Sequence, residues 1–393
     1  MENEQQTTDY QTVESEVDEY KTFEEMNLRD EILRGIYAYG FEKPSPIQAK
    51  AIVPLAMGKD IIAQAQSGTG KTGAFSIGIL QRVNPSNPET QAILLSPTRE
   101  LAEQNLHVIT SIASKENIVV KDLIGGKNYF NRYEEEKTPQ VLVCTPGRLL
   151  GALNKKEVST AGVVLIVLDE ADEMLSKGFQ DQVKEIIKII PKTAQVGLFS
   201  ATIPEQILAI TQHFMNDPVN ILVKRDKLTL EGINQFYIYC PTEEAKLDCL
   251  YTLYNHISIQ QTIIYANTKQ KVDMLAQELT KNNFTVSVLH GGMRQFERYD
   301  VMRDFRSGKS RVLLTTDILS RGIDVQAVSM VINFEIPYKC ETYIHRIGRS
   351  GRYGRKGVGI NLVTESDHQK FQQIENYYSC TIDVFPKDFQ KYL

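Results

Sequence analysis

The chain has 393 residues, of which 42% are hydrophobic and 24% are charged, and its formal net charge is −5 at pH 7. This length exceeds what one hydrophobic core usually supports, so we expect two domains. No apolar run approaches the roughly 20 residues that span a bilayer. The acidic N-terminus also lacks the basic and apolar regions of a secretory signal. These features argue against a membrane protein and predict a cytoplasmic location, with the nucleus as the alternative.

The cysteine spacing indicates the redox compartment, and the charge distribution indicates which partners are compatible with the chain. The five cysteines are scattered without a paired or metal-ligand spacing, which suits a reducing compartment and predicts no zinc site. Residues 1–20 carry seven acids and no Lys or Arg, so the rest of the chain is slightly basic. That bias is compatible with binding to a nucleic-acid backbone. The acidic segment itself is polar and poor in apolar residues, so we expect it to be disordered.

The first ordered stretch is 28–39, and the sequence GFEKPSPIQ follows it at 40–48. Two prolines stiffen this segment, and Gln48 is expected to open a helix that runs toward Met57. A Gln amide donates and accepts hydrogen bonds at once, so Gln48 suits the N6 and N7 edge of adenine. The alternative is a surface or capping residue, which is the more common place of Gln in proteins.

Residues 65–72 read AQSGTGKT, after the apolar run 60–64 and before a plausible helix. This order is that of a phosphate-binding loop, in which glycines let backbone N–H groups face the phosphates and the helix dipole adds positive potential. Lys71 would lie over the β and γ phosphates, and the Thr72 hydroxyl would bind Mg²⁺. The alternative is an ordinary glycine-rich turn. The expected nucleotide contacts are Ser67, Gly68, Thr69, Gly70, Lys71 and Thr72.

Apolar runs then alternate with helical patterns through the first half of the chain. The expected strands are 92–95, 119–124, 141–143, 163–168 and 196–199. Such alternation predicts a parallel sheet covered by helices on both faces. The helix expected at 180–190 carries an apolar stripe at helical spacing, which indicates core packing. Functional side chains are therefore expected just beyond the carboxyl ends of the strands.

The uninterrupted apolar strand 163–168 is followed by the acidic sequence Asp-Glu-Ala-Asp at 169–172. Acids at this place are the expected second half of a nucleotide site. Asp169 would hold the Mg²⁺ shell, and Glu170 would orient or deprotonate the attacking water. The alternative is the ordinary enrichment of acids at a helix N-terminus.

The second half has its own alternation, after a linker near 223–235. The expected strands are 262–266, 286–289, 311–316, 330–334 and 358–363, with helices that include 271–280 and 295–305. Its first strand ends in Asn267-Thr268, where a working phosphate-binding loop would carry Gly-Lys-Thr. This half therefore lacks, at that place, the Gly-Lys-Thr of the first half.

Many short motifs in one order resemble a known family, the DEAD-box RNA helicases. They are Phe23 with GFEKPSPIQ, AQSGTGKT, PTRELA (97–102), Gly-Gly (125–126), TPGR (145–148), DEAD (169–172), SAT (200–202), QFER (295–298), TTDILSRGIDV (315–325) and HRIGRSGR (345–352). The likeness covers nearly all of the chain after the acidic segment. Within the family, DEADEML, ILVKRDKLTLEGI and YIHRIGRSGRYGRKGVGIN are similar to the translation-initiation branch and to its exon-junction paralogue.

The resemblance implies an α/β fold with two tandem RecA-like parallel-sheet domains joined by a short linker. The boundaries would be 1–20 for the disordered tail, 21–222 for the ATP-binding domain, 223–235 for the linker and 236–393 for the C-terminal helicase domain. It also implies the cofactors ATP and Mg²⁺.

The resemblance assigns further site residues by motif. Additional nucleotide contacts would be Phe23, Phe41, Gly322 and Asp324. RNA contacts would be Pro97, Thr98, Arg99, Gly125, Gly126, Thr145, Gly147, Arg148, Asn267, Thr268, Gln295, Arg298, Thr316 and Arg321. Coupling between the nucleotide and RNA sites would use Ser200, Thr202 and His345.

The second half is expected to supply arginines to the nucleotide. Arg349 and Arg352 are three residues apart, and a glycine beside each removes bulk. Two guanidinium groups could thus reach a γ-phosphate, and such an arginine finger contributes about 10³ to 10⁵ in rate in other phosphoryl-transfer enzymes. The alternative is a basic surface patch that faces RNA or solvent.

Three hypotheses on function follow. The first is an ATP-dependent RNA helicase that couples RNA-stimulated ATP hydrolysis to local unwinding of short RNA duplexes, in translation initiation. It would bind single-stranded RNA or short duplexes without sequence preference, act as a monomer and bind a HEAT-repeat initiation scaffold. The second is an ATP-gated RNA clamp in an exon-junction-type complex. The third, a GTPase or a DNA translocase, is weakest, because the sequence has no Asn-Lys-x-Asp segment and Gln48 favours adenine.

Three positions depart from the family pattern. Gly292 stands where many relatives have Asp, Ala266 precedes Asn-Thr where Cys is frequent, and Ser96 precedes PTRELA where Ala is common. None of these departures removes a catalytic group.

Overall fold

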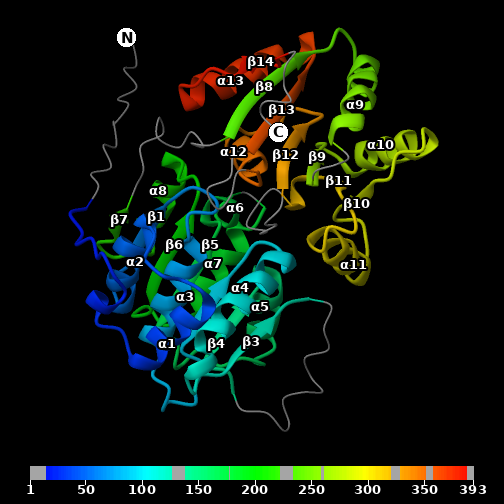
Figure 1. Ribbon diagram of the computed structural model, residues 1–393. Coiled ribbons are helices and arrows are strands. Elements are labelled where there is room, and N and C mark those ends of the chain that lie inside the picture. The colour runs from blue at the N-terminus through cyan, green and yellow to red at the C-terminus, as the bar shows by residue number, and fades with distance from the viewer. Residues whose placement is uncertain are drawn as a thin grey trace, which may run out of the picture. The chain divides into compact units, whose positions relative to one another are not determined.

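The computed structural model describes residues 15–125, 138–176, 178–221, 233–257, 261–319, 328–350 and 357–386. It contains two compact units, one holding Met1–Ala65 and Thr69–Leu222 and the other Gln66–Gly68 and Val223–Leu393. Each unit is built on its own sheet (Figure 1).

The first unit contains a seven-stranded sheet in the order β3-β4-β2-β5-β6-β1-β7. All of its strand pairs are parallel. The strands are β1 (Ile61–Gln64), β2 (Ala92–Leu95), β3 (Val120–Leu123), β4 (Val141–Cys144), β5 (Leu165–Asp169), β6 (Gln195–Ser200) and β7 (Val219–Ile221). Strands β2, β4, β5 and β6 are buried along their whole length. This explains why they are largely apolar, because a parallel strand is covered on both faces. The polar residues lie at strand ends, Asp169 in β5 and Gln195 and Ser200 in β6.

Helices cover both faces of this sheet. One face carries α1 (Asp30–Tyr39), α2 (Pro46–Ala56), α3 (Lys71–Arg82) and α4 (Arg99–Ile112). The other carries α5 (Pro146–Asn154), α6 (Ala171–Met174), α7 (Gln180–Ile189) and α8 (Glu205–Thr211). Alternate strand residues divide between the two cores: Ile61 and Ala63 of β1 pack on the first face, and Ile62 packs on the second.

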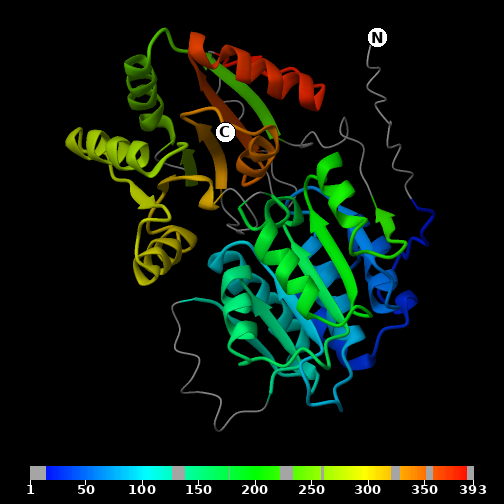
Figure 2. The same ribbon diagram turned by 180° about the vertical axis from the view of Figure 1, so that it is seen from behind.

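The second unit contains another seven-stranded sheet, in the order β10-β11-β9-β12-β13-β8-β14, and its strand pairs are also all parallel. The strands are β8 (Ile233–Tyr239), β9 (Gln261–Tyr265), β10 (Ser287–Leu289), β11 (Val312–Thr315), β12 (Val328–Asn333), β13 (Gly357–Val363) and β14 (Asp383–Val384). One face packs against α9 (Glu243–Ile257) and α10 (Lys269–Lys281). The other packs against α11 (Gln295–Arg306), α12 (Cys340–Ile347) and α13 (His368–Tyr378). Figure 2 shows the same elements from behind.

The predicted α/β fold with parallel sheets is confirmed, with two corrections at element boundaries. Helix α2 begins at Pro46, so Gln48 lies in its first turn and does not open it; Pro is well suited to the first helical position because its missing N–H has no intrahelical acceptor there. Strand β8 begins at Ile233, inside the stretch 223–235 assigned to a linker. The polar side chain of Gln235 made this stretch resemble a linker in the sequence. In the structure, the Gln235 side chain accepts a hydrogen bond from the Tyr343 hydroxyl within the unit.

Among the described residues, no helix combines the length and the apolar character that crossing a membrane requires.

Candidate nucleotide site and nucleic-acid interface

The loop between β1 and α3 has the backbone that a phosphate-binding loop needs. Gly68 and Gly70 have φ values of 80° and 101°, in the left-handed region that favours glycine. A Cβ at Gly70 would also lie 2.8 Å from both the Gln48 amide nitrogen and the Ser45 hydroxyl. The loop then enters α3 at Lys71, so the positive end of the helix dipole lies at the glycine turn.

Lys71 lies inside this loop. Its Nζ donates a 2.7 Å hydrogen bond to the carbonyl of Ala65, and the residue is buried. The Lys71 side chain thus folds back over its own loop. This places its ammonium where a bound phosphate would lie. Thr72 follows in the first turn of α3. The donor set fits a nucleotide triphosphate with Mg²⁺.

Gln48 links α2 to the glycine turn. Its Oε1 accepts a 2.9 Å hydrogen bond from the Ser45 N–H, and its Nε2 donates a 3.2 Å bond to the Gly70 carbonyl. The capping alternative for Gln48 is therefore present in the structure. The amide retains a second N–H and a further lone pair, so its contact with adenine stays a prediction. Phe41 lies beside it, because a Cβ at Gly73 would meet both residues.

Phe23, which was expected to contact the nucleotide, lies in the first core. Its side chain is fully buried in the first core and packs edge-to-face against Tyr37, with ring centroids 6.2 Å apart. Phe23 thus helps to pack α1 against the first core, and its contact with a nucleotide stays a prediction.

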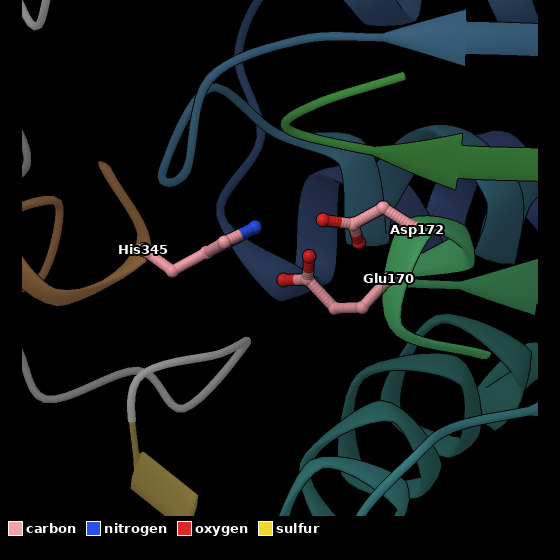
Figure 3. A group of neighbouring side chains, drawn as sticks. All are labelled: Glu170, Asp172 and His345. Atoms are coloured by element: carbon pink, nitrogen blue, oxygen red, sulfur yellow. The ribbon is translucent and has the colours of Figure 1, made fainter. Parts of the chain in front are cut away.

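The acidic motif begins where β5 ends. Asp169 is the last residue of the strand, and Glu170 has φ 52° and ψ 53° before α6 begins at Ala171. Left-handed backbone is unfavourable for a Glu. Figure 3 shows Glu170 and Asp172 pointing away from the same turn of backbone. It also draws His345, which belongs to α12 of the second unit.

Asp169 has an environment that fits a cation. Burial and then the charge of Glu170 raise the pKa of Asp169 to about 7, while the Asn105 amide, the Lys71 ammonium and the Glu170 N–H act in the opposite direction. A divalent cation would relieve the cost of burying this charge. The carboxylate of Asp169 and the Thr72 hydroxyl are oxygen ligands of the kind that Mg²⁺ prefers.

The SAT motif contacts the acidic motif. The Ser200 hydroxyl donates to Asp172 Oδ1 at 2.8 Å, and the Thr202 hydroxyl donates to Asp172 Oδ2 at 2.6 Å. Both are buried; Ser200 is the last residue of the adjacent strand β6, and Thr202 follows it. The two motifs are thus in direct contact, and the coupling role expected for Ser200 and Thr202 stays a prediction.

The RNA contacts expected in the first unit follow three neighbouring strands, β3, β4 and β2. Thr98 caps α4, where its hydroxyl accepts from the Leu101 N–H at 3.3 Å. Gly125 lies against Arg99, since a Cβ there would be 2.7 Å from the guanidinium. Arg148 is paired with Glu157 at 3.3 Å. The other expected residues on these loops are Pro97, Thr145 and Gly147.

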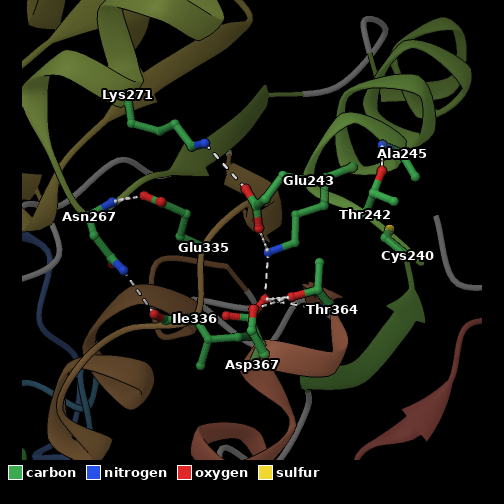
Figure 4. Close-up of polar contacts among 12 residues, drawn as sticks. Cys240, Thr242, Glu243, Ala245, Asn267, Lys271, Glu335, Ile336, Thr364 and Asp367 are labelled. Atoms are coloured by element: carbon green, nitrogen blue, oxygen red, sulfur yellow. Dashed lines mark hydrogen bonds and ion pairs between the residues drawn. The ribbon is translucent and has the colours of Figure 1, made fainter.

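In the second unit, Asn267 and Thr268 connect β9 to α10. The Asn267 N–H donates to Glu335 at 2.7 Å, and its Nδ2 donates to the Ile336 carbonyl at 3.0 Å (Figure 4). Thr268 caps α10 through the Lys271 N–H at 3.2 Å. Further along, Gln295 and Arg298 lie in the first turn of α11, and Thr316 follows β11.

Sequence reasoning missed Arg346, which organises these loops. Its side chain is fully buried and donates to Asp317 at 2.5 Å, the Glu335 carbonyl at 2.8 Å and Asn267 Oδ1 at 2.7 Å. The guanidinium also lies 5.2 Å from the ring centroid of Tyr265. The only available signal was its place in HRIGRSGR.

Helix α12 also carries His345, which is buried, and leads to Arg349, whose Nε donates to the His345 carbonyl at 3.0 Å. Gly126, Arg321, Gly322, Asp324 and Arg352 lie outside the described residues.

The family model for the DEAD/DEAH box helicase matches residues 45–210, and that for the helicase conserved C-terminal domain matches residues 245–354. The chain belongs to the DEAD-box helicase family. It is 52% identical to eukaryotic initiation factor 4A of Caenorhabditis elegans, over 93% of this chain and 92% of that protein. It is also 52% identical to the ATP-dependent RNA helicase eIF4A of Mycosarcoma maydis, over 93% and 89%.

Solved structures of DEAD-box proteins share the fold. Saccharomyces cerevisiae Dbp5 bound to RNA and ADP BeF3 matches with a TM-score of 0.89 and 37% identity, over 95% of this chain and 97% of that one. Mss116p bound to single-stranded RNA and AMP-PNP matches with a TM-score of 0.86 and 27% identity, over 96% and 82%. The predicted tandem RecA-like domains are thereby confirmed.

Proposed function

We infer that this DEAD-box protein is an ATP-dependent RNA helicase of the initiation factor 4A type. It hydrolyses ATP in response to RNA and unwinds short RNA duplexes locally. One observation carries the assignment: the Lys71 ammonium and the Asp169 carboxylate share a buried site beside a left-handed glycine turn. Relatives named eIF4A match more than nine-tenths of the chain at about half identity.

The residues of the first unit have separate proposed roles in phosphoryl transfer. Lys71 binds the outer phosphates, and the glycine turn supplies backbone N–H groups to them. Thr72 and Asp169 would hold Mg²⁺, which neutralises charge on the phosphates when it is bound. Glu170 orients the attacking water and takes its proton. Arg349 and Arg352 are proposed to act on the γ-phosphate as arginine fingers.

The RNA ligand is proposed to bind through its backbone. The proposed contacts in the first unit come from loops that follow β2, β3 and β4, and those in the second follow β9 and β11 or begin α11. Their Thr, Gly and Arg residues suit phosphate and 2′-OH groups, which carry no sequence information. The solved structures of Dbp5 and Mss116p are bound to RNA, which supports the same ligand here.

The cellular role proposed is translation initiation in the cytoplasm, by a monomer that binds a HEAT-repeat scaffold. The names of the relatives support initiation. Pull-down with an initiation scaffold tests this part: failure to bind it, with normal helicase activity, would reject the scaffold and keep the enzyme.

The enzymatic assignment is tested with Lys71→Ala. ATP binding should fall below detection, and RNA-stimulated hydrolysis should disappear with it, because the outer phosphates lose their cation. Lys59→Ala is the matched control, since Lys59 is an exposed lysine in the same unit. A Lys71→Ala protein that binds ATP with wild-type affinity would overturn the assignment.

A further inference from the structure

Ser96, the residue that departs from the family pattern before PTRELA, has a buried polar partner. Ser96 follows β2 and Asn105 lies on α4, and both are fully buried. The Asn105 Nδ2 donates to the Ser96 hydroxyl at 3.0 Å and to Asp169 Oδ2 at 2.8 Å. One amide thus joins the start of the PTRELA segment to the first carboxylate of the acidic motif.

This contact fixes the carboxylate of Asp169. Its Oδ1 accepts the Glu170 N–H at 3.0 Å, and its Oδ2 accepts the Asn105 amide. Because a carboxylate only accepts hydrogen bonds, the NH₂ of Asn105 must face it. Both oxygens are held, so the plane of the carboxylate is set by Asn105 and the backbone together.

Core packing alone does not explain an amide at this place. The Asn105 Oδ1 is buried and has no hydrogen-bond partner among the residues that the structure describes. An unpaired buried acceptor is unfavourable, and such groups in native proteins call for a functional explanation. An apolar side chain of similar size would avoid that cost. We therefore attribute the presence of Asn105 to its NH₂ group, which donates to Ser96 and Asp169.

The same residues connect to the proposed RNA loop. The Ser96 N–H donates to the Cys144 carbonyl at 2.9 Å, immediately before Thr145 of TPGR. After Ser96 the chain passes through Pro97 and Thr98 into α4, and Asn105 lies in the second turn of that helix. A shift of this loop therefore moves the amide that holds Asp169.

We propose that Ser96 and Asn105 are positioning residues that tie the orientation of the Asp169 carboxylate to the position of the segment 97–99. RNA on that segment would then favour the carboxylate orientation that binds Mg²⁺ productively. This proposal rests on the proposed function, since it assumes that Asp169 faces the cation and that 97–99 faces RNA. It adds two residues that do not touch either ligand.

The test compares ATP hydrolysis by the full chain with and without RNA, across a range of Mg²⁺ concentrations. Asn105→Leu keeps a similar side-chain volume but removes the donor. A hydrogen bond to a charged group corresponds to roughly 10- to 100-fold in an equilibrium. We expect stimulation by RNA to fall about tenfold and the Mg²⁺ needed for half-maximal rate to rise about tenfold. Asn105→Ala is the second variant if the leucine is not tolerated.

Ser96→Ala supplies a double-mutant cycle. Alone it should reduce stimulation by about threefold, because the Asn105 amide loses one of its two anchors. In Asn105→Leu it should change nothing further, since Ser96 acts through Asn105. Full additivity of the two effects would overturn the proposed path from Ser96 to Asp169.

Val108→Ala is the control for stability. Val108 is a buried residue of the same helix, and its side chain offers no hydrogen bond to Asp169. It should lower the melting temperature and leave the Mg²⁺ requirement and RNA stimulation unchanged. If Asn105→Leu and Asn105→Ala behave in the same way, the positioning role is rejected. A wild-type chain without RNA-stimulated hydrolysis would instead reject the proposed function itself.

Discussion

The hydroxyl of Thr202 lies 2.6 Å from Oδ2 of Asp172 and donates a hydrogen bond to it. Ser200 donates to the other oxygen of the same carboxylate. The two hydroxyls come from the end of β6, and the carboxylate comes from α6 after β5. Adjacent parallel strands thus bring the SAT and DEAD motifs together at one edge of the sheet.

Replacement of these hydroxyls should affect unwinding more than hydrolysis. In Ser200→Ala/Thr202→Val, Asp172 loses two donors, but Lys71, Asp169 and Glu170 keep their contacts. We expect duplex unwinding to fall by about tenfold or more, as for loss of bonds to a charged group, and RNA-stimulated ATP turnover to change by less than about threefold. Parallel unwinding and ATPase assays measure both. Equal losses in the two rates would contradict a coupling role.

Glu170→Gln should separate binding from chemistry. The amide keeps the size of the side chain but cannot take a proton, so turnover should fall by about 10²- to 10⁴-fold. ATP and RNA should bind with affinities close to wild type. Glu173→Gln, one turn further along α6, is the matched control. Turnover at the wild-type rate in Glu170→Gln would remove Glu170 from the role of base.

RNA binding should weaken as salt is raised. Contacts to single-stranded phosphates release counterions, so the logarithm of the association constant should fall with the logarithm of salt, with a slope of about −0.7 per phosphate contacted. Filter binding to two single strands of different sequence measures this slope. Affinity independent of salt, or a slope that changes with base sequence, would argue against recognition through the backbone.

Much of the fold follows from buried parallel strands. Strand β2 was expected at 92–95 and is found there, because a strand covered on both faces is a continuous apolar run. Two of the four edge strands, β7 and β14, were not expected. Strand β7 has three residues, of which only Ile221 is buried, and the two residues of β14 are exposed. Strand β8 was missed altogether, because its first residues include Asn and Gln.

The residues of the candidate site also differ in how well the sequence predicts them. Lys71 and Asp169 follow strands within short motifs, so local sequence places them. Asn105 and Arg346 were missed because their partners are distant in the chain: 64 residues separate Asn105 from Asp169, and 79 separate Arg346 from Asn267. Such pairs are set by which loops the sheet order brings together. Local spacing carries no information on them.

Acid should weaken the second unit through Asp367. Burial favours the neutral form of this carboxyl, but hydrogen bonds from Lys246 and Thr364 outweigh it and lower the pKa of Asp367. Lys246 is fully buried, and its Nζ lies 2.6 Å from Asp367. A lowered folded-state pKa gives stability that is present above the unfolded value of about 3.9 and is lost as the pH falls through the folded value.

Asp367→Asn should therefore cost stability at pH 7, by about 3 kcal/mol in the free energy of unfolding, because it leaves a buried ammonium with one charged partner fewer. The variant should also lose part of the acid dependence. Urea unfolding at several pH values measures both. Asp300→Asn, in an exposed ion pair with Arg303, is the control. Identical acid dependence in wild type and Asp367→Asn would contradict this assignment.

Arg346→Lys should loosen the Asn267 loop. The planar guanidinium bonds to Asp317, the Glu335 carbonyl and Asn267 in three directions at once. An ammonium on a flexible stem does not reproduce that fork. We expect a loss of about 2 kcal/mol in unfolding free energy, as for hydrogen bonds to a buried charge, and weaker binding of RNA by the full chain.

The matched control for this change is Arg303→Lys, which keeps its charge at an exposed position on α11. It should alter neither property. Asn267→Ala then separates the two effects of Arg346, because it removes the proposed RNA contact while Arg346 keeps its bonds to Asp317 and Glu335. If Arg346→Lys loses stability but binds RNA as the wild type does, Arg346 stabilises the unit without positioning Asn267. If both properties stay at wild-type values, the buried guanidinium does not organise these loops.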